Sequence, residues 1–150
     1  MANNIELLSP AGNAEALYAA VQSGADAVYI GGPTFNARRS AKNFSLEEIK
    51  MYADYCHTYG VDLHVAVNTL MKEKELDELK KYAVDLNNAG VDALIVQDLG
   101  AAKIIRELCP QLPLHASTQM TVTSIEGVKY LENMGFSRVV LARELSVKEI

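Results

Sequence analysis

The chain has 150 residues, of which 49% are hydrophobic and 22% are charged, and its formal net charge is −5. This balance is typical of a globular protein with a buried core. An acidic chain repels a phosphate backbone unless its basic residues cluster, so we expect no direct nucleic-acid binding by this piece. No apolar stretch reaches the ~18 residues of a membrane helix, and we expect no membrane partner.

The chain has two cysteines, Cys56 and Cys109. They are too few for a disulfide framework and fit a reducing compartment. The amino terminus lacks the basic and apolar regions of a signal peptide. We therefore expect a cytoplasmic protein and interpret both cysteines as buried packing residues.

Short apolar runs alternate with stretches of helical spacing along the chain, and this alternation predicts strands and helices in turn. We expect strands at 5–9, 27–30, 61–67, 93–96, 114–116 and 138–142. We expect helices at 14–23, 45–59, 75–88, 101–108 and 124–134. Four of these helices end at a glycine, namely Gly24, Gly60, Gly90 and Gly135.

Two capping boxes mark helix starts in this pattern. Ser45 with Glu48 opens the helix after the second strand, and Ser146 with Glu149 follows the sixth strand. The long loop before Ser45, at 34–44, carries several basic and amide side chains.

Six strands with five intervening helices predict a parallel sheet, because each crossover returns the chain in the same direction. The first turn, at 9–12, reads Ser-Pro-Ala-Gly, which differs from the Gly-x-Gly-x-x-Gly turn of a doubly wound nucleotide-binding sheet. We therefore favour an α/β fold of the TIM-type (β/α)8 barrel, and an open six-stranded sheet is the alternative.

A complete barrel of this type needs eight β/α units and about 250 residues. We expect residues 1–150 to be the N-terminal part of a barrel domain that is truncated before closure. The two open edges of such a sheet are pairing surfaces. We therefore expect self-association through these edges.

Polar residues follow the expected strands, and in a β/α barrel the active site lies at the carboxyl ends of the strands. A polar ring at one mouth is typical of a site for a small polar ligand, although loops are polar in any case. The candidate mouth residues are Asn68, Asp98, Ser117, Thr118, Gln119, Arg143 and Glu144, with Arg38 in the long loop.

The arginines are the clearest candidates for binding an anion at this mouth. The planar fork of Arg143 suits a carboxylate or phosphate, and a structural salt bridge is the alternative. Arg38 either clamps an anion or lies in solvent. Asp98 is a base, a cation ligand or a helix cap. We expect a small anionic ligand or a peptide at this mouth.

Two histidines share the phase of candidate mouth residues. His64 is in phase with Asn68, and His115 with Gln119, so the histidines point into the barrel if those residues do. We interpret them as core histidines with hydrogen-bond partners. Metal-ligand spacing is absent from the sequence, so we expect no metal site. The Gly-x-Ser-x-Gly elbow is absent too, and the catalytic residues stay unknown.

Seven strings at the strand ends carry a likeness to a known family. They read Leu-Leu-Ser-Pro-Ala-Gly-Asn (7–13), Gly-Ala-Asp-Ala-Val-Tyr-Ile-Gly-Gly (24–32), Phe-Asn-Ala-Arg (35–38) with Asn-Phe (43–44), Val-Asn-Thr-Leu (67–70), Gly-Val-Asp-Ala-Leu-Ile-Val-Gln-Asp (90–98), His-Ala-Ser-Thr-Gln (115–119) and Arg-Val-Val-Leu-Ala-Arg-Glu-Leu-Ser (138–146). In order and spacing they resemble peptidase family U32, the collagenase-like peptidases.

This resemblance implies a barrel in a longer protein and a peptidase that hydrolyses peptide bonds by an unassigned mechanism. Other members resemble RNA or ubiquinone hydroxylation factors, which use an iron–sulfur centre and a small carboxylate donor. The family's cysteine-rich signature lies beyond residue 150, and neither Cys56 nor Cys109 matches it. We therefore expect no cofactor within this piece. A third alternative is an inactive barrel fragment that acts as an assembly module.

Overall fold

A computed structural model of the chain describes residues 5–37 and 43–150. The sheet has six parallel strands: β1 (Leu8–Pro10), β2 (Ala27–Gly31), β3 (Asp62–Val67), β4 (Ala93–Val96), β5 (Leu114–Ala116) and β6 (Arg138–Val139). The α-helices are α1 (Ala14–Gln22), α2 (Leu46–Thr58), α3 (Leu76–Asn88), α4 (Leu99–Leu108) and α5 (Ile125–Asn133). Two short 3-10 helices, η1 (Glu73–Glu75) and η2 (Thr118–Met120), were not predicted.

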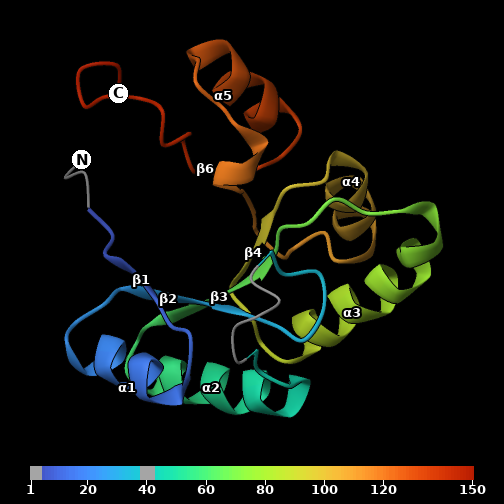
Figure 1. Cartoon of the computed structure of the whole chain (residues 1–150). Coiled ribbons are helices and arrows are strands. Elements are labelled where there is room, and N and C mark those ends of the chain that lie inside the picture. Colours follow the sequence, from blue (N-terminus) through green and yellow to red (C-terminus); the bar gives the residue numbers. More distant parts are fainter. Residues whose placement is uncertain (1–4, 38–42) are drawn as a thin grey trace.

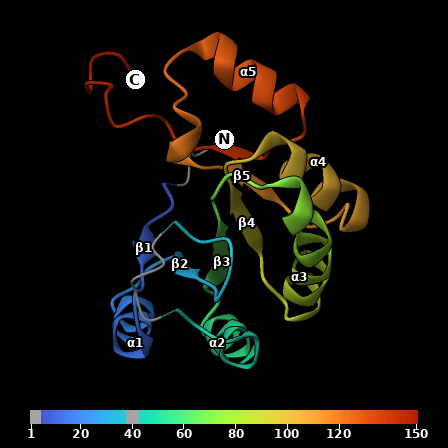
Figure 2. The same ribbon diagram turned by 45° about the vertical axis from the view of Figure 1, so that its right-hand side comes forward.

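The order of the strands confirms the barrel pattern. Each strand pairs in parallel with the strand before it, in the order β1-β2-β3-β4-β5-β6. A doubly wound sheet reverses its strand order at a switch point, and this sheet does not. The helices lie around the outside of the curved sheet (Figures 1 and 2). The result is an incomplete β/α barrel of six strands.

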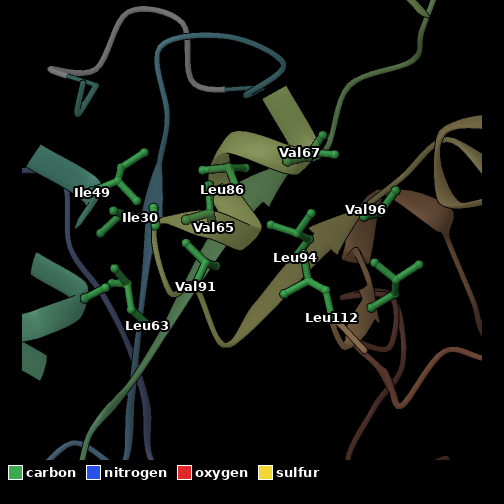
Figure 3. Packing of buried hydrophobic residues seen from close by; sticks show 14 of the residues in the cluster. Ile30, Ile49, Leu63, Val65, Val67, Leu86, Val91, Leu94, Val96 and Leu112 are labelled. Carbon is green, nitrogen blue, oxygen red and sulfur yellow. The ribbon is translucent and has the colours of Figure 1, made fainter. Parts of the chain in front are cut away.

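Alternate side chains of each strand face the helices and form the core. Leu63, Val65 and Val67 of β3 are buried on this outer face. Ile49 of α2 and Leu86 of α3 pack in the same cluster (Figure 3). Each such side chain stabilises the fold by about 1.5–3 kcal/mol when it leaves water. The other set of side chains faces the barrel interior.

The predicted helix ends are confirmed. Gly24, Gly60, Gly90 and Gly135 all have positive φ angles, between 69° and 89°, a conformation that glycine adopts without steric cost. None of the described helices is long and apolar enough to cross a bilayer.

The predicted capping box of Ser45 and Glu48 opens a helix. Glu48 N donates to Ser45 Oγ (3.2 Å), and Ser45 N donates to the Glu48 carboxylate (2.8 Å), at the start of α2. Ser146 N also donates to Glu149 (2.8 Å), but this segment forms a turn.

The first and last strands differ from the predicted ranges. The strand expected at 5–9 begins at Leu8, and the strand expected at 138–142 ends at Val139. β6 and its neighbour β5 share only two residue pairs, His115 with Arg138 and Ala116 with Val139. The outer edges of β1 and β6 have no strand partner within the described residues. Self-association through them stays a prediction.

Gly32 allows a tyrosine of α3 to approach the end of β2. A Cβ at Gly32 would lie 1.7 Å from Tyr82 Oη, and this hydroxyl is buried with no hydrogen-bond partner among the described residues. Gly32→Ala should therefore destabilise the protein by about 1–3 kcal/mol through overpacking.

Thermal unfolding of the full-length protein measures this effect. Tyr82→Phe alone should be neutral or stabilising, since it removes an unpaired buried hydroxyl. Combined with Gly32→Ala it should recover part of the lost stability. Gly12→Ala is the matched control, because a Cβ there meets no atom within 4 Å. Equal melting temperatures for the Gly32 and Gly12 variants would contradict the packing argument.

Candidate functional site

A cavity of about 660 Å³ opens where the strands end. Its floor is largely apolar, formed by inward-facing residues of the strands: Leu8, Pro10, Tyr29, Ala66 and Ile95. Its upper wall is polar: Asn36, Asn43, Asn68, Ser117, Thr118, Gln119, Thr121, Arg143 and Glu144. An apolar floor with convergent polar groups is the usual form of a small-molecule site.

Six of the eight predicted mouth residues line this one cavity: Asn68, Ser117, Thr118, Gln119, Arg143 and Glu144. They come from the ends of β3, β5 and β6, which parallel pairing brings to the same edge of the sheet. Their role in binding stays a prediction. Arg38 lies outside the described residues.

Asp98 does not line the cavity. One of its carboxylate oxygens accepts a hydrogen bond from Ala101 N (2.8 Å), which caps α4. The other accepts from Met71 N in the loop after β3 (3.2 Å). Of the three predicted roles, the structure places Asp98 in that of helix cap.

Amide side chains hold the loop after β2 against the cavity. Ala37 N donates to Asn68 Oδ1 (3.0 Å), and Asn36 Nδ2 donates to Asn43 Oδ1 (2.8 Å). Gly31 permits this arrangement, because a Cβ there would lie 2.0 Å from Asn36 Nδ2. Asn68, which follows β3, is thus partly committed to positioning the loop after β2.

The residues after β5 form a tight turn. Gln119 N donates to Ser117 Oγ (3.2 Å), which caps η2. Gln97 Nε2 donates to Gln119 O (3.4 Å), and Thr121 adopts a left-handed conformation with φ 56°. This turn presents Thr118 and the side chain of Gln119 to the cavity.

Arg143 and Glu144 supply the charged groups of the cavity wall. Both are exposed, in the turn that follows β6. Within residues 5–37 and 43–150 no ion pair engages Arg143, so the predicted alternative of a structural salt bridge is not formed there. Its guanidinium is free to receive an anion.

Sequence reasoning missed Tyr29, Asn36, Asn43 and Thr121 as cavity residues. Tyr29 could have been found, because it is paired with His64 in the sheet and therefore shares its inward face. The two asparagines lie in a loop whose path no periodic pattern indicates.

His64 and His115 do point into the interior, and both are buried. Their rings meet edge to face, with centroids 4.8 Å apart. The prediction that both have hydrogen-bond partners is wrong for His64, whose Nδ1 is buried without one among the described residues.

Burial lowers the pKa of both histidines, and the charge of Arg138 adds to this effect. The pKa of His115 falls to about 4. Both imidazoles are therefore neutral at physiological pH.

The two cysteines are buried, as predicted, and neither lines the cavity. Burial raises the pKa of Cys56 to about 11 and also raises that of Cys109. No group of three or more His, Cys, Asp or Glu side chains in the described part of the chain is arranged to hold a metal ion. These residues do not fit an iron–sulfur cluster, whose usual ligands are four cysteine thiolates.

Fold and cavity together define a β/α-barrel protein with a polar-walled cavity at the carboxyl ends of its strands. The model of "Peptidase family U32" matches residues 12–150, and the chain belongs to this family. A solved structure titled "The Structure of the U32 Peptidase Mk0906" matches 94% of this chain and 60% of its own, with a TM-score of 0.71 at 13% identity. That likeness supports the fold alone.

Three relatives are similar over nearly the whole chain. The "23S rRNA 5-hydroxycytidine C2501 synthase" of Escherichia coli is 45% identical over 99% of this chain and 22% of its own length. The "tRNA hydroxylation protein P1" of Bacillus subtilis is 39% identical over 97% and 34%. The "Uncharacterized protease MJ0090" of Methanocaldococcus jannaschii is 38% identical over 97% and 35%. The chain thus spans about a third or less of these relatives.

The neutral histidines make stability depend on pH. Because the folded pKa of His115 lies below its ordinary value of about 6.5, the unfolded chain binds the proton first as the pH falls. Stability should be intact above pH ~6.5 and decline toward pH ~4, by an amount on the order of 3 kcal/mol.

Urea unfolding of the wild type and of His115→Gln across this pH range checks the expectation. The variant should lose less stability on acidification, because it has no group to protonate at this position. NMR titration of the histidine rings gives the pKa values directly. A His115 pKa at or above 6.5 would show that the ring is not desolvated.

Proposed function

We propose that this chain is part of an RNA-hydroxylating enzyme of family U32, and that its cavity binds a small carboxylate-bearing molecule used in that reaction. Two relatives at 45% and 39% identity carry names for hydroxylation of ribosomal and transfer RNA. The similarity to each of them extends over 97% or more of this chain. These relatives support hydroxylation more directly than the family name supports proteolysis.

The free guanidinium of Arg143 carries the ligand part of this proposal. It lies in a wall of amide and hydroxyl groups, which can orient a carboxylate by hydrogen bonding. The apolar floor around Tyr29 can cover the carbon skeleton of such a molecule. The volume of about 660 Å³ suits a small molecule.

In this enzyme, parts of the protein outside this chain would make most of the contacts with RNA. The net charge of this chain is −5, and a negative surface disfavours a phosphate backbone. An iron–sulfur centre, if the enzyme uses one, also belongs to those parts, since Cys56 and Cys109 are buried at separate positions.

Peptide hydrolysis is the second candidate, favoured by the family's name and by the relative named as a protease. It requires an activated nucleophile or water. Ser117 is the buried hydroxyl of the cavity wall, but its Oγ accepts a bond from Gln119 N. Among the described residues no hydrogen bond joins it to a histidine or a carboxylate. The described cavity wall therefore supports peptide hydrolysis less well than ligand binding. The third candidate, an inactive assembly module, has no specific observation in its favour.

Substitution of Arg143 tests the proposal in the full-length protein. In cells that lack the native gene, Arg143→Ala should lower the hydroxylated nucleosides of rRNA or tRNA by roughly 30-fold or more, because it removes the charged partner of a carboxylate. Arg143→Lys should retain part of the activity, since it keeps the charge and loses the fork. Mass spectrometry of digested RNA measures both.

Lys103→Ala is the matched control, because this cation is exposed on α4 and, among the described residues, its one ion pair is with the neighbouring Glu107. It should leave the modification unchanged. Normal RNA hydroxylation in cells that carry Arg143→Ala would contradict the proposal that this cavity binds the carboxylate ligand. Gelatin hydrolysis by the purified wild type, lost in Arg143→Ala, with no change in RNA, would favour the peptidase.

A further inference from the structure

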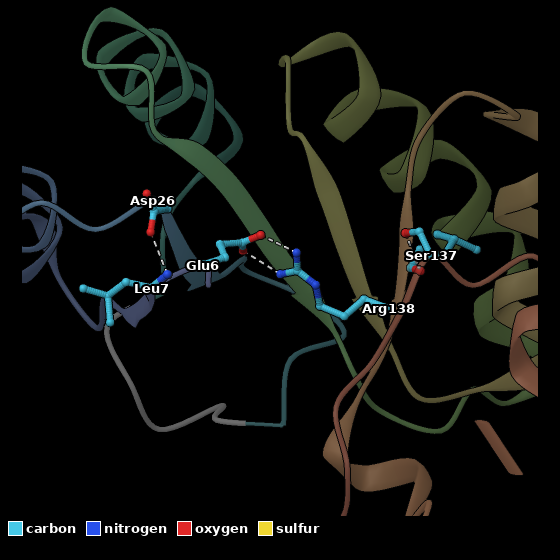
Figure 4. A network of polar contacts seen from close by, with 6 residues as sticks. Glu6, Leu7, Asp26, Ser137 and Arg138 are labelled. Atoms are coloured by element: carbon cyan, nitrogen blue, oxygen red, sulfur yellow. Dashed lines mark hydrogen bonds and ion pairs between the residues drawn. The ribbon is translucent and has the colours of Figure 1, made fainter. Parts of the chain in front are cut away.

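An ion pair joins the two outermost strands across the interior of the sheet. Arg138 begins β6, and Glu6 lies two residues before β1. Arg138 Nη1 donates to Glu6 Oε1 (2.6 Å), and Nη2 donates to Oε2 (Figure 4). A bidentate arginine–carboxylate pair restrains orientation as well as distance. This contact links segments 132 positions apart in the sequence.

Backbone pairing alone holds the last strand weakly. β5 and β6 share two residue pairs, whereas β2 and β3 share five. Five pairs of neighbouring strands connect β1 to β6. Small rotations between the strands of each pair therefore accumulate into a larger displacement of β6 relative to β1. A direct link between Glu6 and Arg138 removes this freedom.

The same two strands lead to opposite walls of the cavity. β1 ends in Pro10, followed by Ala11 and Gly12, and β6 is followed by Arg143 and Glu144, all of which line the cavity. A change in the separation of the strands would therefore change the width of the cavity. It would also move Arg143 relative to the facing wall.

We propose that Glu6 and Arg138 are positioning residues, whose ion pair sets the separation of β1 and β6 and with it the width of the cavity above. Arg138 thus differs from Arg143 on the same segment: the guanidinium of Arg138 is engaged by a carboxylate, whereas that of Arg143 forms no ion pair with the part of the chain that the structure describes. The part of this inference that concerns catalysis rests on the proposed function, whereas the part that concerns strand separation does not.

The neighbouring imidazoles fit this role. His115 is the sheet partner of Arg138, and its ring meets that of His64. Both are neutral because they are buried, so neither competes with Arg138 for Glu6. The hydrogen bond from Arg138 lowers the pKa of Glu6, which keeps this carboxylate charged. The negative charges of Asp62 and Asp92 act on His64 in the opposite direction, and they only partly offset the lowering of its pKa.

Hydrogen exchange in the full-length protein tests the link without reference to activity. Val140 N and Ala142 N donate to Ala116 O and Val122 O, and these bonds hold the segment after β6. Glu6→Gln, a change on the β1 side, should speed exchange at these two amides by roughly threefold to tenfold. Arg138→Met should do the same at Leu7 N and Ala11 N, which donate to Asp26 Oδ2 and Tyr29 O. The double variant Glu6→Arg with Arg138→Glu should restore slow exchange at both ends.

Asp77→Asn is the matched control, because it breaks an exposed pair with Lys80 on α3 and should leave both segments unchanged. Faster exchange only in the segment that carries the substitution would overturn the proposal, as would a double variant that behaves like the single ones. In cells, Glu6→Gln should also lower RNA hydroxylation, and the double variant should recover it. If the wild type hydroxylates no RNA, the proposed function fails while the exchange data still decide on the link.

Discussion

Parallel pairing of each strand with the strand before it is the constraint from which the rest of this structure follows. It places all helices on one side of the sheet and curves the sheet around an interior. It also sends every carboxyl end to the same edge, so residues distant in the sequence share one wall. Asn68, Gln119 and Arg143 meet around one cavity for this reason. Any shift of a strand by one residue would exchange its interior and core faces.

Alternate side chains of each strand face either the helices or the interior of the sheet. On β3 the side chains at the core positions are aliphatic and pack against the helices, whereas the interior positions include His64 and Ala66. Glu6 and Arg138 form a charged pair that is about one-third exposed, and the cavity floor is largely apolar. Its mouth is polar again. Such layering allows a charged pair, two neutral imidazoles and the cavity to lie within one curved sheet.

Much of this arrangement could be predicted from the sequence, because strand ends and helix-ending glycines are local signals. Six mouth residues followed directly from the strand ends. Asp98 shows the limit of that reasoning, since a side chain after a strand can turn back to cap the next helix. The cross-sheet pair of Glu6 and Arg138 could not be predicted, because neither residue belongs to a motif and the contact depends on the curvature of the sheet.

The burial of the two cysteines has a practical consequence for chemical labelling. Thiol reagents attack the thiolate, and the raised pKa of Cys56, about 11, leaves almost none of it at neutral pH. Cys109 is buried as well. Maleimides should therefore spare both native thiols of this region, and a single cysteine engineered at the cavity rim would accept a fluorophore there with no competing reaction from Cys56 or Cys109.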